Sequence, residues 1–200
     1  MDAAADRPLA ELAFTVLDFE TTGTVKGFCS LPWQLGAVFV RSGEVVLEEG
    51  GFDTLLRVPE EYPFSKRAPG THASQRAAIA AAPAFAEVWP ALHARLSCTV
   101  PVAHNAATER TVLARMAPMT QYAYWVDTLK LSRKIYPSLP GFALETLVPA
   151  LGLQPMLARL VPGRAPHDAF YDAVACALLL LHLITLPGWS GLTLNDYYAL

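Results

Sequence analysis

The stretch "TVLDFETTG", residues 15–23, decides the fold of this 200-residue chain. Its apolar residues predict a buried strand over residues 13–19, yet Asp18 and Glu20 stand two positions apart in or beside that strand. Residues two apart in a strand face the same side of the sheet, and adjacent carboxylates repel each other, above all when they are buried. A divalent cation resolves this repulsion, because Mg²⁺ and Mn²⁺ prefer carboxylate oxygens. The alternative is an edge strand whose acids face water.

Composition and charge limit the classes of protein to which the chain can belong. Hydrophobic residues make up 53% of the chain and charged residues 16%, so one domain can bury a substantial core. The net charge of −3 excludes a general positive field, so a nucleic-acid site must be local or assisted by metal ions. Cys29, Cys98 and Cys176 form no CxxC pair, which argues against structural zinc and a disulfide framework. This cysteine usage suits a reducing, cytoplasmic compartment.

The two ends of the chain predict neither a targeting signal nor a membrane anchor. Residues 1–12 are too acidic and polar for a signal peptide. The apolar run over residues 173–186 is shorter than the ~20 residues that span a bilayer, so we expect a buried helix and no membrane association. The expected organisation is an N-terminal extension over residues 1–12, a main domain over residues 13–186 and a packed tail over residues 187–200.

The order of the expected elements is strands first, then alternating helices and strands. Expected strands cover residues 13–19, 34–40, 44–49, 52–58 and 98–105, and expected helices cover residues 73–82, 84–97, 107–116, 144–151 and 169–186. Residues 122–136 predict a strand that runs into a helix. Turn signals at Ser42-Gly43 and Gly50-Gly51 favour an antiparallel meander of three strands. The pattern indicates an α/β or α+β protein with a mixed sheet covered by helices.

Two later segments add candidate metal ligands. The segment "VAHNAATER" places His104, Asn105 and Glu109 just past an apolar strand, where sites are common in open α/β sheets. The segment "PHDAFYDAV" places His167 and Asp172 at the start of the last helix, close enough along the chain to meet in space. Asp172 stands among apolar residues, and a carboxylate in an otherwise apolar helix usually needs a partner.

Several residues of these segments also have a structural interpretation, whereas Asp172 has none. His167 is then a surface histidine in a loop, and Asp168 is the N-cap of the last helix. We expect His104 and Asn105 to organise the end of their strand, and Asp127 to cap the helix that follows it.

Three motifs carry a resemblance when they are read together. D-x-E-T-T-G, V-A-H-N-A with an acid four residues after the Asn, and H-x-A-x-x-D-A resemble the motifs of the DEDDh 3′→5′ exonucleases. This family includes the proofreading subunit of bacterial DNA polymerase III, ribonuclease T and oligoribonuclease. "QLGAV", "GTHAS" and "VDTLKLSR" are smaller matches, and the resemblance covers residues 13–181. It implies an α/β fold of the ribonuclease H-like type and phosphodiester hydrolysis with two divalent ions, Mg²⁺ or Mn²⁺.

The resemblance also implies a role for each candidate catalytic residue. Asp18 would bridge both ions, while Glu20 and Asp172 would complete the coordination of one of them. Glu109 would hold the other ion, although the family usually has Asp there; Glu keeps the charge and adds one methylene. His167 would take the proton from the attacking water.

On the substrate side, the resemblance implies that Thr21 and Thr22 seat the terminal nucleotide. His72 matches a substrate-side histidine of the family, although Ala73 departs from the usual Gly. Thr108 stands where the family often has a Phe that stacks near the substrate, so base contacts at this position should be weaker.

The implied partner is the 3′ end of a single-stranded DNA or RNA, and a DNA polymerase is a second candidate partner. Bound ions would reverse the local sign of the acidic site. Five cationic residues are candidates to line a path for the strand, although each one taken singly is expected to be an ordinary surface cation: Arg110, Arg133, Lys134, Arg159 and Arg164.

The predicted activity is the release of nucleoside monophosphates from a 3′ end. Two other functions stay open. The chain could be a non-catalytic ribonuclease H-like module that binds a polymerase or another nucleic-acid complex, or a phosphoesterase that acts on small nucleotides with the same acids.

Overall fold

A computed structural model describes residues 5–47 and 51–200 of the chain. Its six-stranded sheet has the order β3-β2-β1-β5-β6, with β4 also paired to β2. The strands are β1 (Phe14–Thr21), β2 (Pro32–Arg41), β3 (Glu44–Val46), β4 (Phe52–Leu55), β5 (Val100–Ala103) and β6 (Val126–Asp127). Strands β1, β2 and β3 are antiparallel, whereas β5 runs parallel to β1 and β6 runs parallel to β5. The predicted α/β class, a meander joined to parallel strands, is confirmed.

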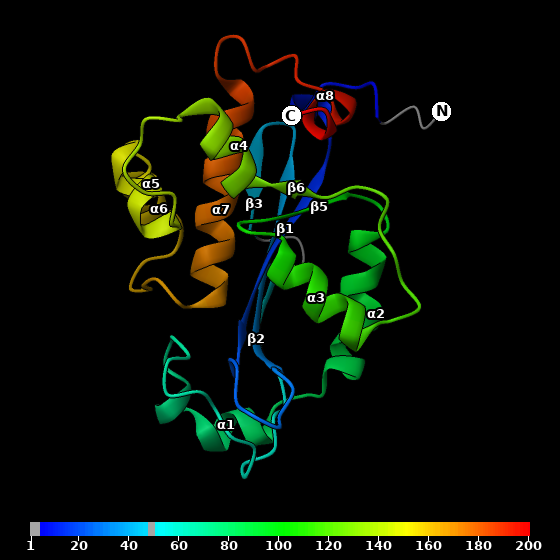
Figure 1. Ribbon diagram of the computed structural model, residues 1–200, viewed down its shortest axis with the longest axis vertical. Coiled ribbons are helices and arrows are strands. Elements are labelled where there is room, and N and C mark those ends of the chain that lie inside the picture. The colour runs from blue at the N-terminus through cyan, green and yellow to red at the C-terminus, as the bar shows by residue number, and fades with distance from the viewer. Residues whose placement is uncertain (1–4, 48–50) are drawn as a thin grey trace.

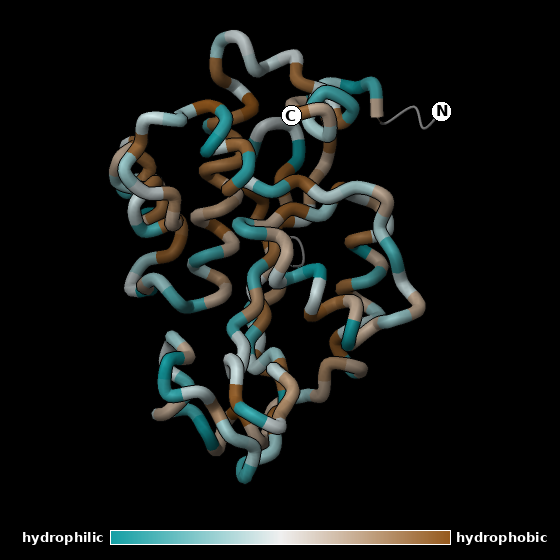
Figure 2. Tube along the Cα trace, in the orientation of Figure 1, coloured by the Kyte–Doolittle hydropathy of each residue, from teal (hydrophilic) through white to brown (hydrophobic). Residues whose placement is uncertain are grey.

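Helices cover both faces of this sheet (Figure 1). The helices are α1 (Arg76–Ala81), α2 (Phe85–Leu96), α3 (Ala107–Met116), α4 (Thr128–Ile135), α5 (Leu144–Ala150), α6 (Gln154–Leu160), α7 (Ala169–Thr185) and α8 (Leu194–Tyr198). Helix α7 packs on one face together with α4, α5 and α6, and α2 and α3 cover the other face. Hydrophobic residues are concentrated in the strands and along α7, between the layers (Figure 2).

Strand β1 divides its side chains between these two layers. Phe14 and Val16 belong to the core under α7, whereas Leu17 and Phe19 belong to the core under α2 and α3. Since alternate residues of a strand share a face, Asp18 continues the row of Phe14 and Val16, and Glu20 follows it. The acids therefore stand where the apolar row under α7 ends.

Helix α7 meets the sheet at Gly36, the residue of β2 that pairs with Asp18. A Cβ atom added to Gly36 would lie 2.1 Å from the carbonyl oxygen of Ala169. The buried side chain of Gln34 accepts a hydrogen bond of 3.3 Å from the Ala169 N–H. The segment "QLGAV" thus seats the first turn of α7 directly on the sheet and brings Asp172 to the acids of β1.

Several boundaries differ from the predictions. The helix expected over residues 73–82 is a 3-10 turn, His72–Ser74, followed by the short α1. Side-chain bonds within residues 71–75 explain the difference, because Ser74 donates to the carbonyl of Thr71 and such local bonds compete with an α-helix. The strand expected at the start of residues 122–136 is reduced to β6.

The expected strand over residues 44–49 is observed as β3, and residues 48–50 lie outside the described part of the chain. Helices α6 and α8 have no counterpart among the predicted elements. Within residues 5–47 and 51–200, none of the helices combines the length and the apolar character that crossing a bilayer requires.

The C-terminal helix α8 packs against the outer side of β6. The hydroxyl of Tyr197 accepts a hydrogen bond of 2.9 Å from the Asp127 N–H. The hydroxyl of Tyr198 accepts from the Trp125 N–H at 2.7 Å and donates to the Trp125 carbonyl at 3.0 Å. Leu194 and Tyr197 are buried, so α8 extends the core that surrounds α7.

Candidate active site

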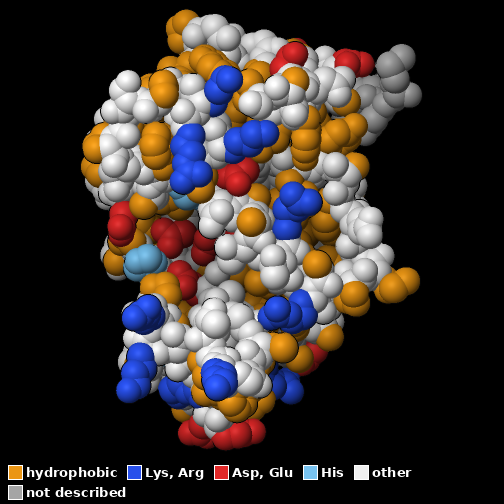
Figure 3. All heavy atoms as spheres, in the orientation of Figure 1, with side chains coloured by type: hydrophobic (Ala, Val, Ile, Leu, Met, Phe, Trp, Pro, Cys, Tyr) orange, Lys and Arg blue, Asp and Glu red, His pale blue; other side chains and the backbone are white. Residues whose placement is uncertain are grey.

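A hollow of about 400 Å³ opens at the carboxyl ends of β1 and β5. Asp18, Glu20, Glu109, His167 and Asp172, which come from three separate segments of the chain, all line it. Other residues of its wall are Phe19, Pro69, His104, Asn105, Thr108 and Glu145. Figure 3 shows acidic and histidine side chains gathered in a hollow between the upper and lower parts of this face, with Lys and Arg side chains above and below it.

Three of these side chains form a compact group. Glu20, His167 and Asp172 each offer a ligand atom, and these atoms all lie within 4.8 Å of one another. Asp18 lies among the other acids: burial raises its pKa well above the ordinary value, and the charges of Glu109, Asp172 and Glu20 raise it further.

The pKa values of the neighbouring acids are raised as well. Burial raises the pKa of Glu20 to about 7, and the charge of Asp172 adds to the effect. Burial raises the pKa of Glu109 to about 8 and that of Asp172 to about 6, the latter against a hydrogen bond from the His167 backbone. Without a cation, Glu20 and Glu109 hold protons near neutral pH, and a divalent ion would displace them.

The donor set fits divalent metal ions. Glu109 is 2% exposed, and among the described residues its Oε2 atom is buried without a hydrogen-bond partner. A buried oxygen without a partner is costly, and carboxylate oxygens are the ligands that Mg²⁺ and Mn²⁺ prefer. These residues therefore suit Mg²⁺ or Mn²⁺ in preference to a softer metal.

We expect the metal-free protein to lose stability as the pH rises. Because the pKa of Glu109 is raised from 4.5 to about 8 on folding, the folded chain keeps a proton that the unfolded chain has lost between these values. The free energy of unfolding should therefore fall from about pH 5 to about pH 8. Mg²⁺ or Mn²⁺ at about a hundred times its Kd should add ~2.7 kcal/mol of stability. Melting temperatures with and without metal at both pH values measure these effects.

The metal-induced gain should be larger at the higher pH, where the ion displaces fewer protons. Glu109→Gln is the comparison variant, since it removes one carboxylate whose pKa is raised. It should weaken both the pH dependence of the melting temperature and the increase in melting temperature caused by the metal. An equal metal response at both pH values would contradict the coupling of metal binding to these acids.

The loop before α7 holds His167 at the hollow. The residue has a φ of +67°, in the left-handed region, which costs a non-glycine residue roughly 1–2 kcal/mol. Its N–H donates a hydrogen bond of 2.8 Å to Oδ2 of Asp172. A Cβ atom on Gly70 would lie 2.8 Å from the His167 carbonyl, so the segment around Gly70 packs closely on this loop. Asp168 caps α7 by accepting from the N–H groups of Phe170 and Tyr171.

Asp127 organises the end of β5. Its carboxylate accepts hydrogen bonds from the N–H groups of Asn105 at 3.0 Å and Ala106 at 3.1 Å. It also caps α4 by accepting from the N–H of Leu129 at 2.9 Å, so the predicted cap is confirmed. Asn105 has a φ of +66°, and this sharp turn leads directly into α3, which carries Glu109.

The ring of His104 ties the same strand end to two other elements. It lies 2.8 Å from the hydroxyl of Thr128 and donates from Nε2 to the carbonyl of Phe142 at 2.7 Å. Both ring nitrogens are thus engaged within the protein, which confirms the predicted structural role of His104.

The structure corrects the predicted role of the Thr22 hydroxyl. Thr22 is fully buried, its hydroxyl accepts from the Leu31 N–H at 3.0 Å, and its own N–H donates to the Leu31 carbonyl at 2.8 Å. It therefore has no side-chain atom free to contact a nucleotide. Thr21 is partly exposed, and its hydroxyl accepts a long bond of 3.3 Å from the Gly23 N–H.

His72 packs against two aromatic side chains, and its substrate-side role stays a prediction. Its ring stacks on Phe64 with the ring centroids 4.7 Å apart, and it lies edge-on to Trp33. Its Nε2 lies 3.2 Å from the Ala68 carbonyl, and the half-buried side chain is not among the residues that line the hollow. Thr108, by contrast, is exposed at the wall of the hollow.

One of the five candidate cations is already neutralised. Arg164 forms ion pairs with Asp53 and, at 2.8 Å, with the N-cap residue Asp168, so it is not available to a phosphate. The guanidinium of Arg133 lies over the ring of Phe142 at 5.8 Å. The remaining candidates, Arg110, Lys134 and Arg159, are exposed.

Glu145 is an acid of the hollow that the sequence did not predict. It stands in the first turn of α5, is exposed, and adds to the effect of burial on the raised pKa of Asp172. An acid in a first helical turn is ordinary, so only the packing of α5 against α7 places Glu145 at this wall.

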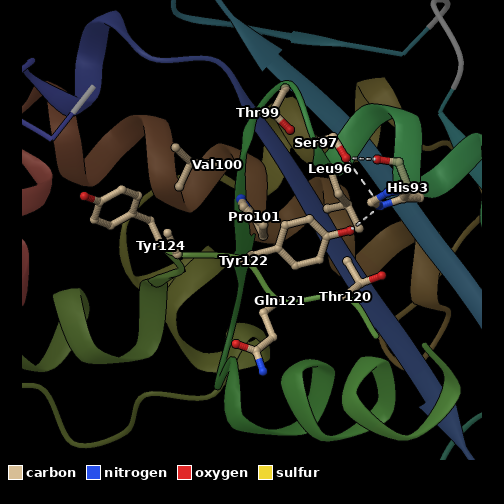
Figure 4. A pocket seen from close by; sticks show the side chains of 11 residues that line it. His93, Leu96, Ser97, Thr99, Val100, Pro101, Thr120, Gln121, Tyr122 and Tyr124 are labelled. Atoms are coloured by element: carbon tan, nitrogen blue, oxygen red, sulfur yellow. Dashed lines mark hydrogen bonds between the residues drawn. The ribbon is translucent and has the colours of Figure 1, made fainter. Parts of the chain in front are cut away.

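A second hollow, of about 330 Å³, lies between the end of α2 and the segment before β6. In Figure 4 the hydroxyls of Tyr122 and Ser97 both point to the ring of His93, at 3.1 and 3.3 Å from its Nδ1. The described lining contains no carboxylate, and its main polar groups bond to one another. This hollow is therefore unsuited to hold a hard metal ion.

Comparisons with known proteins agree with the acidic hollow. The family model described as "Exonuclease" (RNase_T) matches residues 15–180. A "DNA polymerase III subunit epsilon-like protein" of Rhodobacter capsulatus is 33% identical over 96% of the chain, and "Exodeoxyribonuclease 10" of Escherichia coli is 27% identical over 90% of it. The solved structure "Exonuclease X in complex with 5′ overhanging duplex DNA" has a TM-score of 0.68 and 25% identity, and covers 92% of this chain and 98% of that one.

These relatives differ in length from the chain. The match spans 26% of the Rhodobacter capsulatus protein and 73% of Exodeoxyribonuclease 10.

Proposed function

The chain belongs to the exonuclease family, and from this premise we propose that it is a 3′→5′ exonuclease that releases nucleoside monophosphates from single-stranded DNA or RNA. One observation carries the proposal: Asp18, Glu20, Glu109, His167 and Asp172 line a single hollow. These residues are the acids and the histidine on which the resemblance to DEDDh exonucleases rests. The duplex with a 5′ overhang in the Exonuclease X structure supports a DNA end as one substrate.

The carboxylates would hold the divalent ions, and His167 would act on water. Asp18, Glu20, Glu109 and Asp172 supply hard oxygen ligands from β1, α3 and α7. Bound ions would stabilise the negative charge that develops on the scissile phosphate. The imidazole of His167 is exposed at the hollow, where it would accept the proton of the attacking water. The hydrogen bond from its N–H to Asp172 keeps it at that position.

His167→Asn should lower kcat by about 10²–10⁴ with little change in KM. Asn removes the basic imidazole but tolerates a positive φ, so the left-handed backbone and its bond to Asp172 should persist. The dependence of kcat on pH should become weaker, because the variant lacks the imidazole that would accept the proton. Steady-state rates over a range of pH measure the effect, and an unchanged melting temperature is the control. A variant with wild-type kcat would remove His167 from proton transfer.

A panel of labelled oligonucleotides tests the proposal directly. Single-stranded DNA, mismatched duplex DNA and short RNA would each be incubated with Mg²⁺ or Mn²⁺, and the products separated. Mononucleotides that appear in order from the 3′ end are expected. The absence of release with either metal would favour the non-catalytic module, and hydrolysis of small thymidine monophosphate esters without cleavage of oligomers would favour a nucleotide phosphoesterase.

A further inference from the structure

Two segments at the lower end of the molecule carry positive charge in a chain whose net charge is −3. Residues 22–31 and 62–76 contain no Asp or Glu. Their cationic residues are Lys26, Lys66, Arg67 and Arg76. Figure 3 shows Lys and Arg side chains gathered at this end, between the acidic hollow and a group of acidic side chains at the lowest edge. We call the surface formed by Lys26, Phe28, Tyr62, Lys66 and Arg67 the basic rim.

The first part of the basic rim is a tight turn that displays an aromatic ring. The N–H of Phe28 donates to the carbonyl of Val25 at 3.0 Å, and Gly27 has a φ of +85° at the tip of the turn. Phe28 is 51% exposed, a large fraction for an aromatic side chain. Tyr62 meets it edge-to-face at 5.4 Å and donates from its hydroxyl to the Cys29 carbonyl at 2.7 Å. The ring is therefore held in position from one side and open to solvent on the other.

The second part of the basic rim is a turn over residues 65–68, with Lys66 and Arg67 at its tip. The N–H of Ser65, the first residue of this turn, donates to the carbonyl of Thr22 at 2.8 Å. This bond fixes the turn against the segment that follows β1. Pro69, two residues beyond Arg67, lines the acidic hollow. The cationic turn thus lies at the edge of the candidate active site.

Other cations of the same region are engaged within the protein. Arg57 pairs with Glu87 at 2.9 Å. Arg76 donates to the Tyr62 carbonyl at 2.9 Å, and Arg115 donates to a backbone carbonyl of the segment before β2. Lys26, Lys66 and Arg67 are exposed and form no ion pair with the described residues. These three charges are therefore available to the phosphates of a ligand.

We propose that the basic rim binds the stretch of the nucleic-acid strand immediately 5′ of the terminal nucleotide. The strand leaves the hollow past Pro69, its phosphates contact Lys66 and Arg67, and an unpaired base stacks on Phe28. Stacking on an aromatic ring accepts any base, so the rim supplies affinity without selecting sequence. This inference rests on the proposed function, because the 3′ end must occupy the hollow.

The length of the oligonucleotide provides the test. Phe28→Ala should weaken binding of a single-stranded octamer about tenfold and leave binding of a nucleoside monophosphate unchanged, because a single nucleotide occupies the hollow alone and does not reach the ring. Fluorescence anisotropy with Ca²⁺ as the metal measures both affinities. Met119→Ala is the matched control, since Met119 is 96% exposed and lies outside the rim. Equal affinities of Phe28→Ala and the intact chain for the octamer would overturn the proposal.

The salt dependence tests the cations. Replacing Lys66 and Arg67 together by Ser should reduce the slope of log K against log salt for the octamer by about 1.4, or about 0.7 for each charge. Arg41→Ser is the control, because Arg41 lies beyond Val40 at the end of β2 that is opposite to the acids. An unchanged slope for the octamer would overturn the role of the turn. A loss of affinity confined to fully paired duplex DNA would overturn it as well.

These results separate the rim from the catalytic proposal. If the intact chain binds oligomers with the expected length dependence but releases no nucleotide, the proposed activity fails and the basic rim stands. If the chain releases nucleotides and the rim variants match it at every length, the basic rim fails and the activity stands.

Discussion

Asp18→Asn should lower the release of nucleotides at least a thousandfold. Burial raises the pKa of Asp18, and the charges of the neighbouring acids raise it further. Asp18 therefore lies among the acids that would share an ion. Loss of ~4 kcal/mol of charge stabilisation on the phosphate corresponds to about three powers of ten in rate. Asn keeps the size of the side chain and removes only its charge. Single-turnover release of mononucleotides with saturating Mg²⁺ or Mn²⁺ measures the effect.

Two measurements make this result specific to the site. Without metal, Asp18→Asn should be at least as stable as the intact chain, because Asn is neutral at every pH, whereas ionising the buried Asp18 beside other acids costs stability. Glu145→Gln is the matched control, since Glu145 lines the same hollow but is exposed, in the first turn of α5. Its rate should change by less than about threefold, because an exposed group contributes little. Activity retained in Asp18→Asn would exclude it from the mechanism.

Gly36→Ala should destabilise the fold strongly, because the added methyl group meets backbone rather than a flexible side chain. The new Cβ would lie 2.1 Å from the Ala169 carbonyl oxygen and 2.3 Å from the Phe170 nitrogen, both of them backbone atoms of α7. The helix must move away from the sheet, at a cost of about 3 kcal/mol or more. This loss lowers the melting temperature by roughly 6–12 °C for a domain of this size. The displaced helix also carries Asp172 away from Asp18, so activity should fall.

Gly191→Ala is the control for this substitution. A Cβ atom on Gly191 meets no atom within 4 Å, and its φ lies outside the left-handed range. Thermal unfolding followed by circular dichroism should give the control a melting temperature close to that of the intact chain. A Gly36→Ala variant as stable as this control would show that the contact between α7 and β2 relaxes easily.

The sequence was most informative where periodicity and chemistry agreed. Alternation along β1 showed that Asp18 and Glu20 share a face, and the structure places them on the face under α7. Asp172 was conspicuous because α7 is otherwise almost entirely apolar. The spacing of "VAHNAATER" predicted both the end of β5 and the start of α3, which is observed at Ala107.

The sequence was least informative where long-range packing decides exposure. Thr22 looks like a ligand contact in "ETTG", but pairing with Leu31 buries its hydroxyl. Arg164 looks like a surface cation, but two carboxylates from different segments neutralise it. Glu145 reaches the hollow only through the position of α5. None of these contacts leaves a local signature in the chain.

The pairing of the Tyr197 and Tyr198 hydroxyls with the backbone beside β6 has a consequence for self-association. A sheet normally ends in a row of unsatisfied amides, which other molecules can use as a template for aggregation. Here phenol groups occupy the Trp125 and Asp127 amides, and α8 shields them. Another copy of the chain that meets this edge therefore encounters aromatic side chains rather than free amides, so strand addition is blocked there.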